Sequence, residues 1–74
     1  MKLYVVDGEI INLDRVLTVF VRLGACVVNF GNEATQAYRF EDPKDAEVMK
    51  QEILEVMRSP DKNEITESAL RPMQ

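Results

Sequence analysis

The sequence lacks histidine and tryptophan, and it has a single cysteine, Cys26. The absence of histidine removes the commonest metal ligand and general base. One cysteine cannot form an intramolecular disulfide, and without a histidine to activate it, a thiolate nucleophile would need a nearby Arg or Lys. A small buried side chain is the more ordinary role for Cys26. We therefore predict that the chain is not an enzyme, with no catalytic residue, no metal site and no cofactor.

Long apolar runs are also lacking. The opening segment has only four consecutive apolar residues, Leu3 to Val6, before Asp7. A secretory signal needs a longer apolar core, and a membrane-spanning helix needs roughly 18 apolar residues or more. We therefore expect a cytoplasmic protein with no membrane partner.

Positive charge is scarce, because 9 Lys and Arg residues stand against 13 Asp and Glu residues and leave a net charge of −4. Such a chain repels the phosphate backbone unless its basic residues gather on one side. General nucleic-acid binding is therefore not expected. The three glycines are isolated, and none opens a phosphate-binding pattern that runs from a strand into a helix.

The apolar residues that are present predict strands over the first half of the chain. Asp7-Gly8 separates two short apolar segments, and this dipeptide supplies the positive φ angles of a two-residue hairpin turn. Three further segments, 16–23, 26–30 and 35–40, are predicted to form a meander, with a turn at Gly24-Ala25.

A helix is predicted to begin at Pro43, since Asp42 is a favourable N-cap and proline is favoured at the first helical position. Apolar residues recur at helical spacing as far as Arg58. They are Ala46, Met49, Ile53, Val56 and Met57.

The predicted fold class is α+β, with a small antiparallel sheet of four to five strands in a meander, followed by one C-terminal amphipathic helix packed on one face. Residues 1–58 would form a single domain. Residues 59–74 would form a polar tail, in which residues 66–70 can form a short helical turn.

The order of meander, acidic-proline cap and amphipathic helix, with Phe40-Glu41-Asp42-Pro43 as the cap, resembles the closing half of a pleckstrin-homology-like domain. The resemblance covers residues 10–57 and rests on the pattern of elements. The cluster of Lys and Arg that would bind a lipid headgroup is absent between the first strands, so the resemblance implies no lipid binding.

The middle strands are apolar on both faces, which is unusual for a sheet with one face in water. Alternation divides them into two sets of side chains. The inner set is Leu17, Val19, Val21, Leu23, Cys26, Val28 and Phe30; the outer set is Val16, Thr18, Phe20, Arg22, Val27 and Asn29, continued by Thr35, Ala37 and Arg39. The outer set is expected to be covered by the N-terminal hairpin, by a second copy of the chain, or by a different partner.

These faces predict a small non-catalytic protein-interaction or oligomerisation module that associates through the second sheet face or an edge strand. The expected interaction residues are Val16, Phe20, Arg22, Val27 and Arg39. The expected partner is a second copy or another protein. The alternative function is single-stranded nucleic-acid binding by the same aromatic and arginine face.

Overall fold

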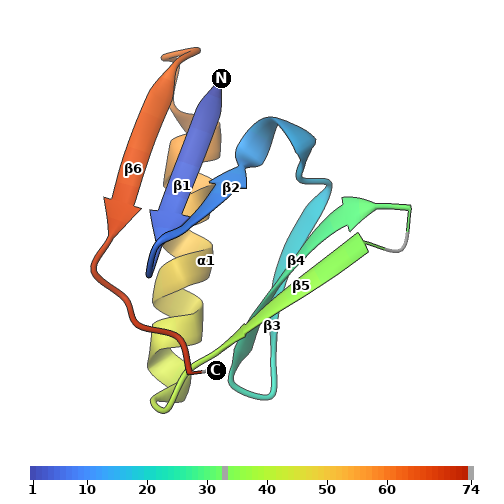
Figure 1. Cartoon of the computed structure of the whole chain (residues 1–74), viewed down its shortest axis with the longest axis vertical. Coiled ribbons are helices and arrows are strands. Elements are labelled where there is room, and N and C mark those ends of the chain that lie inside the picture. Colours follow the sequence, from blue (N-terminus) through green and yellow to red (C-terminus); the bar gives the residue numbers. More distant parts are fainter. Residues whose placement is uncertain (33, 74) are drawn as a thin grey trace.

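The computed structural model describes residues 1–32 and 34–73, and within them the fold is α+β, as predicted (Figure 1). The elements in chain order are β1 (Lys2–Val6), β2 (Glu9–Asn12), the short 3-10 helix η1 (Leu13–Arg15), β3 (Thr18–Arg22), β4 (Ala25–Gly31), β5 (Ala34–Arg39), α1 (Pro43–Arg58) and β6 (Glu64–Ser68).

The strands form two three-stranded sheets, in the orders β2-β1-β6 and β3-β4-β5, where one sheet of four to five strands was expected. The break lies at η1, between β2 and β3. The side chain of Asn12 accepts a hydrogen bond from the Asp14 N–H at 3.0 Å, and the Val16 N–H donates to the Leu13 carbonyl. These local bonds turn the chain before β3, so the first hairpin does not continue into the meander.

The turns from β1 to β2 and from β3 to β4 use positive φ angles. Asp7 and Gly8 join β1 to β2 as predicted, with φ of 48° and 81°. The turn between β3 and β4 lies one residue earlier than expected, at Leu23-Gly24, because Arg22 pairs directly with Ala25. Leu23 therefore adopts a φ of 52°, a left-handed conformation that is costly for a leucine.

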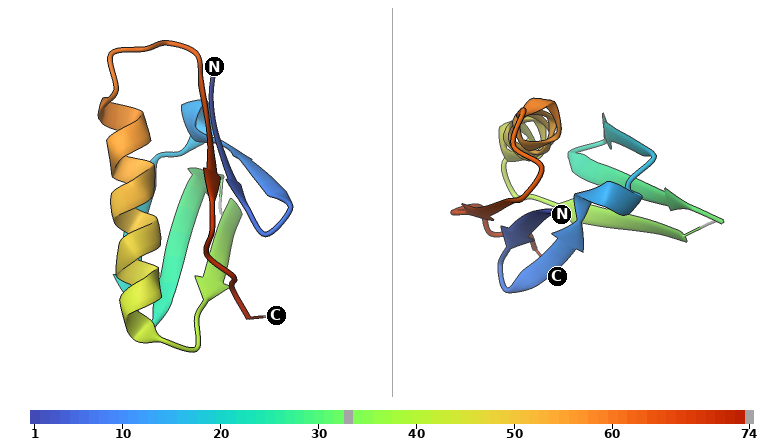
Figure 2. Two further views of the ribbon diagram at one scale, coloured as in Figure 1. Left: turned by 90° about the vertical axis from the view of Figure 1, so that its left-hand side faces the viewer. Right: turned by 90° about the horizontal axis from the view of Figure 1, so that it is seen from above.

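Helix α1 has the predicted bounds, and the Asp42 carboxylate accepts a hydrogen bond from the Lys44 N–H at 3.0 Å. The helix packs along one side of both sheets and contacts β1, β3, β4 and β6 (Figure 2). Its buried residues are Ala46, Met49, Ile53 and Val56, whereas Met57, expected on the same stripe, is exposed. The other core residues are Tyr4, Val6, Ile11, Leu13, Val16, Cys26, Val28, Tyr38 and Phe40.

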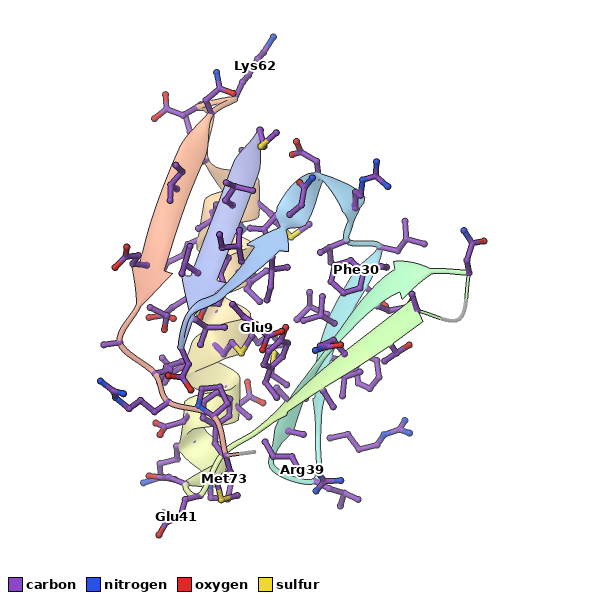
Figure 3. All side chains as sticks on the ribbon, in the orientation of Figure 1. Glu9, Phe30, Arg39, Glu41, Lys62 and Met73 are labelled. Atoms are coloured by element: carbon purple, nitrogen blue, oxygen red, sulfur yellow. The ribbon has the colours of Figure 1, made fainter. Side chains whose placement is uncertain are left out.

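The segment expected to form a polar tail contains β6 in place of a helical turn, and β6 runs parallel to β1. Its side chains are mostly polar, so its position depends on backbone pairing and on bonds such as Ser68 Oγ to the Glu52 carboxylate, 2.8 Å. Further on, the Met73 N–H donates to the Arg39 carbonyl at 2.7 Å, at the end of β5 (Figure 3). Gln74, the last residue of this expected tail, lies outside the described residues.

Candidate protein-interaction surface

The outer face of the β3-β4-β5 sheet carries rows of side chains that cross all three strands. Phe20 pairs with Val27, and Val27 pairs with Ala37, so one row is apolar. In the next row Arg22 pairs with Ala25 and Ala25 with Arg39. We call this surface the outer face; its residues are Thr18, Phe20, Arg22, Ala25, Val27, Asn29, Thr35, Ala37 and Arg39.

Four of the five predicted interaction residues lie together on the outer face: Phe20, Arg22, Val27 and Arg39. The expectation that Val16 joins them is wrong, because Val16 is 8% exposed and belongs to the core. Val16 follows η1 and precedes β3, so the alternation of the strand does not extend back to it. The η1 turn directs its side chain inward.

The N-terminal hairpin does not cover the outer face. Tyr4, Val6 and Ile11 of that hairpin instead belong to the shared core on the inner side. Phe20 remains 38% exposed, and Ala37 and Arg39 are exposed. Within residues 1–32 and 34–73, most of the outer face is therefore open to solvent, whereas Ala25, which pairs with Arg22 and Arg39, is 4% exposed.

The charge on the outer face opposes that of the whole chain. Arg22 and Arg39 are its two charged side chains, on a chain with a net charge of −4. The Arg22 guanidinium lies 5.5 Å from the centroid of the Phe20 ring, in cation–π range. The face thus combines an apolar row with a positively charged row.

Strand β3 also has an edge that pairs with no other strand in the described part of the chain. Beside this edge an apolar groove of about 360 Å³ separates β3 from α1. We call it the β3–α1 groove; its lining residues are Val16, Leu17, Thr18, Val19, Lys50, Ile53, Leu54 and Met57. Strand β3 therefore has accessible apolar side chains on both sides and unpaired backbone groups between them.

Sequence reasoning missed this groove because Leu17 and Met57 were assigned to the core. Leu17 is 68% exposed, and Leu23, also assigned to the inner set, is 91% exposed. Leu54 and Met57 lie on the flank of α1 nearest β3 and are exposed. The sequence feature that could have indicated the groove is the width of the apolar stripe on α1. Leu54 and Met57 widen this stripe beyond what one sheet can cover.

A second apolar face was also missed, on the outer side of the β2-β1-β6 sheet. Leu3 pairs with Ile65, and Val5 pairs with Ile10. Ile10 and Ile65 are both exposed. Sequence reasoning missed this face because Ile65 was assigned to the polar tail.

The groups with raised pKa values are core residues. Burial raises the pKa of the Cys26 thiol to about 11, so the thiol is protonated at neutral pH. Burial, with the acceptors Glu52 and Glu9, raises the pKa values of the Tyr4 and Tyr38 hydroxyls. Tyr4 donates to Glu52 at 2.6 Å, and Tyr38 to Glu9 at 3.2 Å, with Glu9 reaching from β2 toward β5 (Figure 3).

The aromatic residues are mostly unavailable for stacking. Tyr4, Tyr38 and Phe40 are buried, and Phe30 is half-buried against the core. Phe20 is the one aromatic residue on the outer face. Surfaces that bind single strands usually stack several bases on several aromatic side chains.

Across the described ranges, no group of three or more acidic, cysteine or histidine side chains is placed to hold a metal ion. Neither helix in those ranges has the length and apolar character needed to cross a membrane. Comparisons with protein families, curated proteins and solved structures find no match for this chain.

Proposed function

We propose that this chain is a non-catalytic protein-interaction module that binds another polypeptide along β3. The observation that carries the proposal is the position of β3. It is an edge strand with Phe20 exposed on the outer face and Leu17 exposed beside the β3–α1 groove. Exposed edge strands of this kind accept an added strand through backbone hydrogen bonds, with side-chain contacts on both faces.

The energetics favour association at this strand. Burying a Leu or Phe side chain completely contributes roughly 1.5 to 3 kcal/mol. The exposed fractions of Leu17 and Phe20, 68% and 38%, together correspond to about 2 kcal/mol. Unpaired N–H and C=O groups of β3 add hydrogen bonds, and Arg22 and Arg39 would select among partners by charge.

We propose further that the module acts in a reducing cytoplasm. The support is the single cysteine, which is buried and can have no intramolecular disulfide partner.

A peptide-display selection tests the surface. Peptides selected on the native chain are measured by fluorescence anisotropy against the native chain, Phe20→Asp and Thr35→Asp. Thr35 is an exposed residue of the same outer face, on β5 rather than β3, so Thr35→Asp is the matched control. We expect at least a tenfold loss of affinity for Phe20→Asp and little change for Thr35→Asp, with both variants folded by circular dichroism.

Two results would contradict the proposal. The first is that the selected peptides bind Phe20→Asp as tightly as they bind the native chain. The second is that the chain binds a labelled single-stranded oligonucleotide tightly and that this binding weakens steeply as the salt concentration rises, because phosphate contacts release counterions. The second result would favour the nucleic-acid alternative.

A further inference from the structure

The segment from Leu17 to Leu23 reads Leu-Thr-Val-Phe-Val-Arg-Leu and is nearly palindromic about Phe20. Val19 and Val21 lie one residue from Phe20 on either side, and Leu17 and Leu23 lie three residues away. When two copies of a strand pair antiparallel across a two-fold axis, residues equidistant from the axis face each other. An axis at Phe20 would therefore match each valine with a valine and each leucine with a leucine.

The backbone of β3 is in the right phase for this pairing. Because the Leu23-Gly24 turn has two residues, Arg22 and Ala25 close the ladder as a hydrogen-bonded pair, and Phe20 with Val27 is the next such pair. The N–H and C=O groups of Val19 and Val21 then point away from β4, toward the free edge. With the axis at Phe20, Val19 of one copy faces Val21 of the other, so these free groups can form four hydrogen bonds.

The two leucines that flank β3 are largely exposed in the isolated chain, although the Leu17 side chain packs over Gly31 at the end of β4. Leu23 is 91% exposed and stands at a φ of 52°, where a hairpin turn favours Asn, Asp or Gly. Leu17 is 68% exposed. Leu17 lies just before β3 and Leu23 in the turn just after it, so the two-fold would bring Leu17 of one copy near Leu23 of the other at both ends of the paired strands.

The charges are compatible with this arrangement. Arg22 of one copy would face Thr18 of the other, so no like charges stand directly opposite. Leu54 and Met57, on the α1 side of the β3–α1 groove, lie beside the paired strands and add apolar contact area.

We infer that the partner of β3 is a second copy of this chain, paired antiparallel about a two-fold axis at Phe20. The inference rests on the proposed function and names its partner. The β3-β4-β5 sheets of the two copies would then join into one six-stranded sheet, with the strand order β5-β4-β3-β3-β4-β5. Phe20 of each copy meets its equivalent at the axis, on the outer face.

Disulfide cross-linking tests the register. The chain carrying Phe20→Cys places two thiols opposite each other at the axis, where a disulfide can form under mild oxidation. Thr18→Cys is the matched control on the same strand and face. In this register the two introduced thiols lie four residues apart along the strands, about 13 Å, which exceeds disulfide range. Cys26 is buried and stays in both variants.

We expect the yield of covalent dimer to be at least tenfold higher for Phe20→Cys than for Thr18→Cys. For the native chain without substitutions, we expect light scattering to give the mass of two chains. Equal cross-linking of the two variants would overturn the register. A native chain that remains a monomer up to millimolar concentration would overturn the dimer. If that monomer still binds selected peptides through Phe20, the proposed function stands and only the identity of the partner fails.

Discussion

Replacing Leu23 with asparagine should stabilise the folded monomer. Leu23 is the first residue of the tight turn between β3 and β4, with a φ of 52°. A left-handed conformation costs an ordinary L-residue roughly 1 to 2 kcal/mol, and asparagine tolerates it much better. Because the side chain is 91% exposed, Leu23→Asn gives up little packing in the monomer.

We therefore expect the free energy of unfolding of the monomer to rise by about 1 kcal/mol and its Tm to rise by roughly 4 to 8 °C. Urea denaturation followed by circular dichroism, at a concentration where light scattering shows monomer, measures the change. Leu23→Ala is the control, because it also removes the leucine but has no preference for positive φ.

The same substitution should weaken the proposed dimer. Each dimer loses two Leu17–Leu23 contacts, so we expect the dissociation constant to rise at least tenfold, since about 1.4 kcal/mol corresponds to that factor. An asparagine variant no more stable than the alanine variant would refute the assignment of backbone strain to Leu23. An unchanged dissociation constant would refute the leucine contact.

Two further predictions concern the N-cap of α1 and the buried Cys26. Asp42→Ala should lower the free energy of unfolding by about 1 kcal/mol, because the Lys44 N–H loses its acceptor. Asp42→Asn should retain most of the stability. If urea denaturation gave the native chain and Asp42→Ala equal stability, a stabilising role for this cap would be contradicted. Stability should also fall above pH 9. The Cys26 thiol has a pKa of about 11 in the folded chain against an ordinary value of 9.0, so the unfolded chain loses this proton first, whereas below pH 9 both states hold it. Cys26 should account for about 1 kcal/mol of the loss by pH 10. The raised pKa values of Tyr4 and Tyr38 act in the same direction, so Cys26→Ala should remove the Cys26 part and leave the tyrosine part. An identical decline in that variant would contradict the assignment to Cys26.

The helix and the first hairpin could be predicted because their signals are local. Asp42 and Pro43 determine where α1 begins through one hydrogen bond and one backbone angle, and both lie within three residues of the helix start. Asp7-Gly8 determines the first turn in the same way. Neither signal depends on what packs against it.

The outer face was predictable in part. The two-residue alternation of a strand places Phe20, Arg22 and Val27 on one face whatever their neighbours are. The prediction that Val16 lies on the outer face is wrong because Val16 lies outside the strand, between η1 and β3. Leu23 was assigned to the inner set by the same alternation, and the Leu23-Gly24 turn removes it from the strand.

The fold class, helix α1 and the face on which Phe20 lies can be predicted from the amino-acid sequence, because propensity, capping and alternation act over a few residues. The division of the described strands into two sheets and the pairing of β6 with β1 depend on contacts between segments that are distant in the sequence. Residues 64–68 contain a single large apolar side chain, and their pairing energy comes from backbone groups of a strand at the opposite end of the chain. The β3–α1 groove has the same origin, since its two walls meet only when the chain is folded.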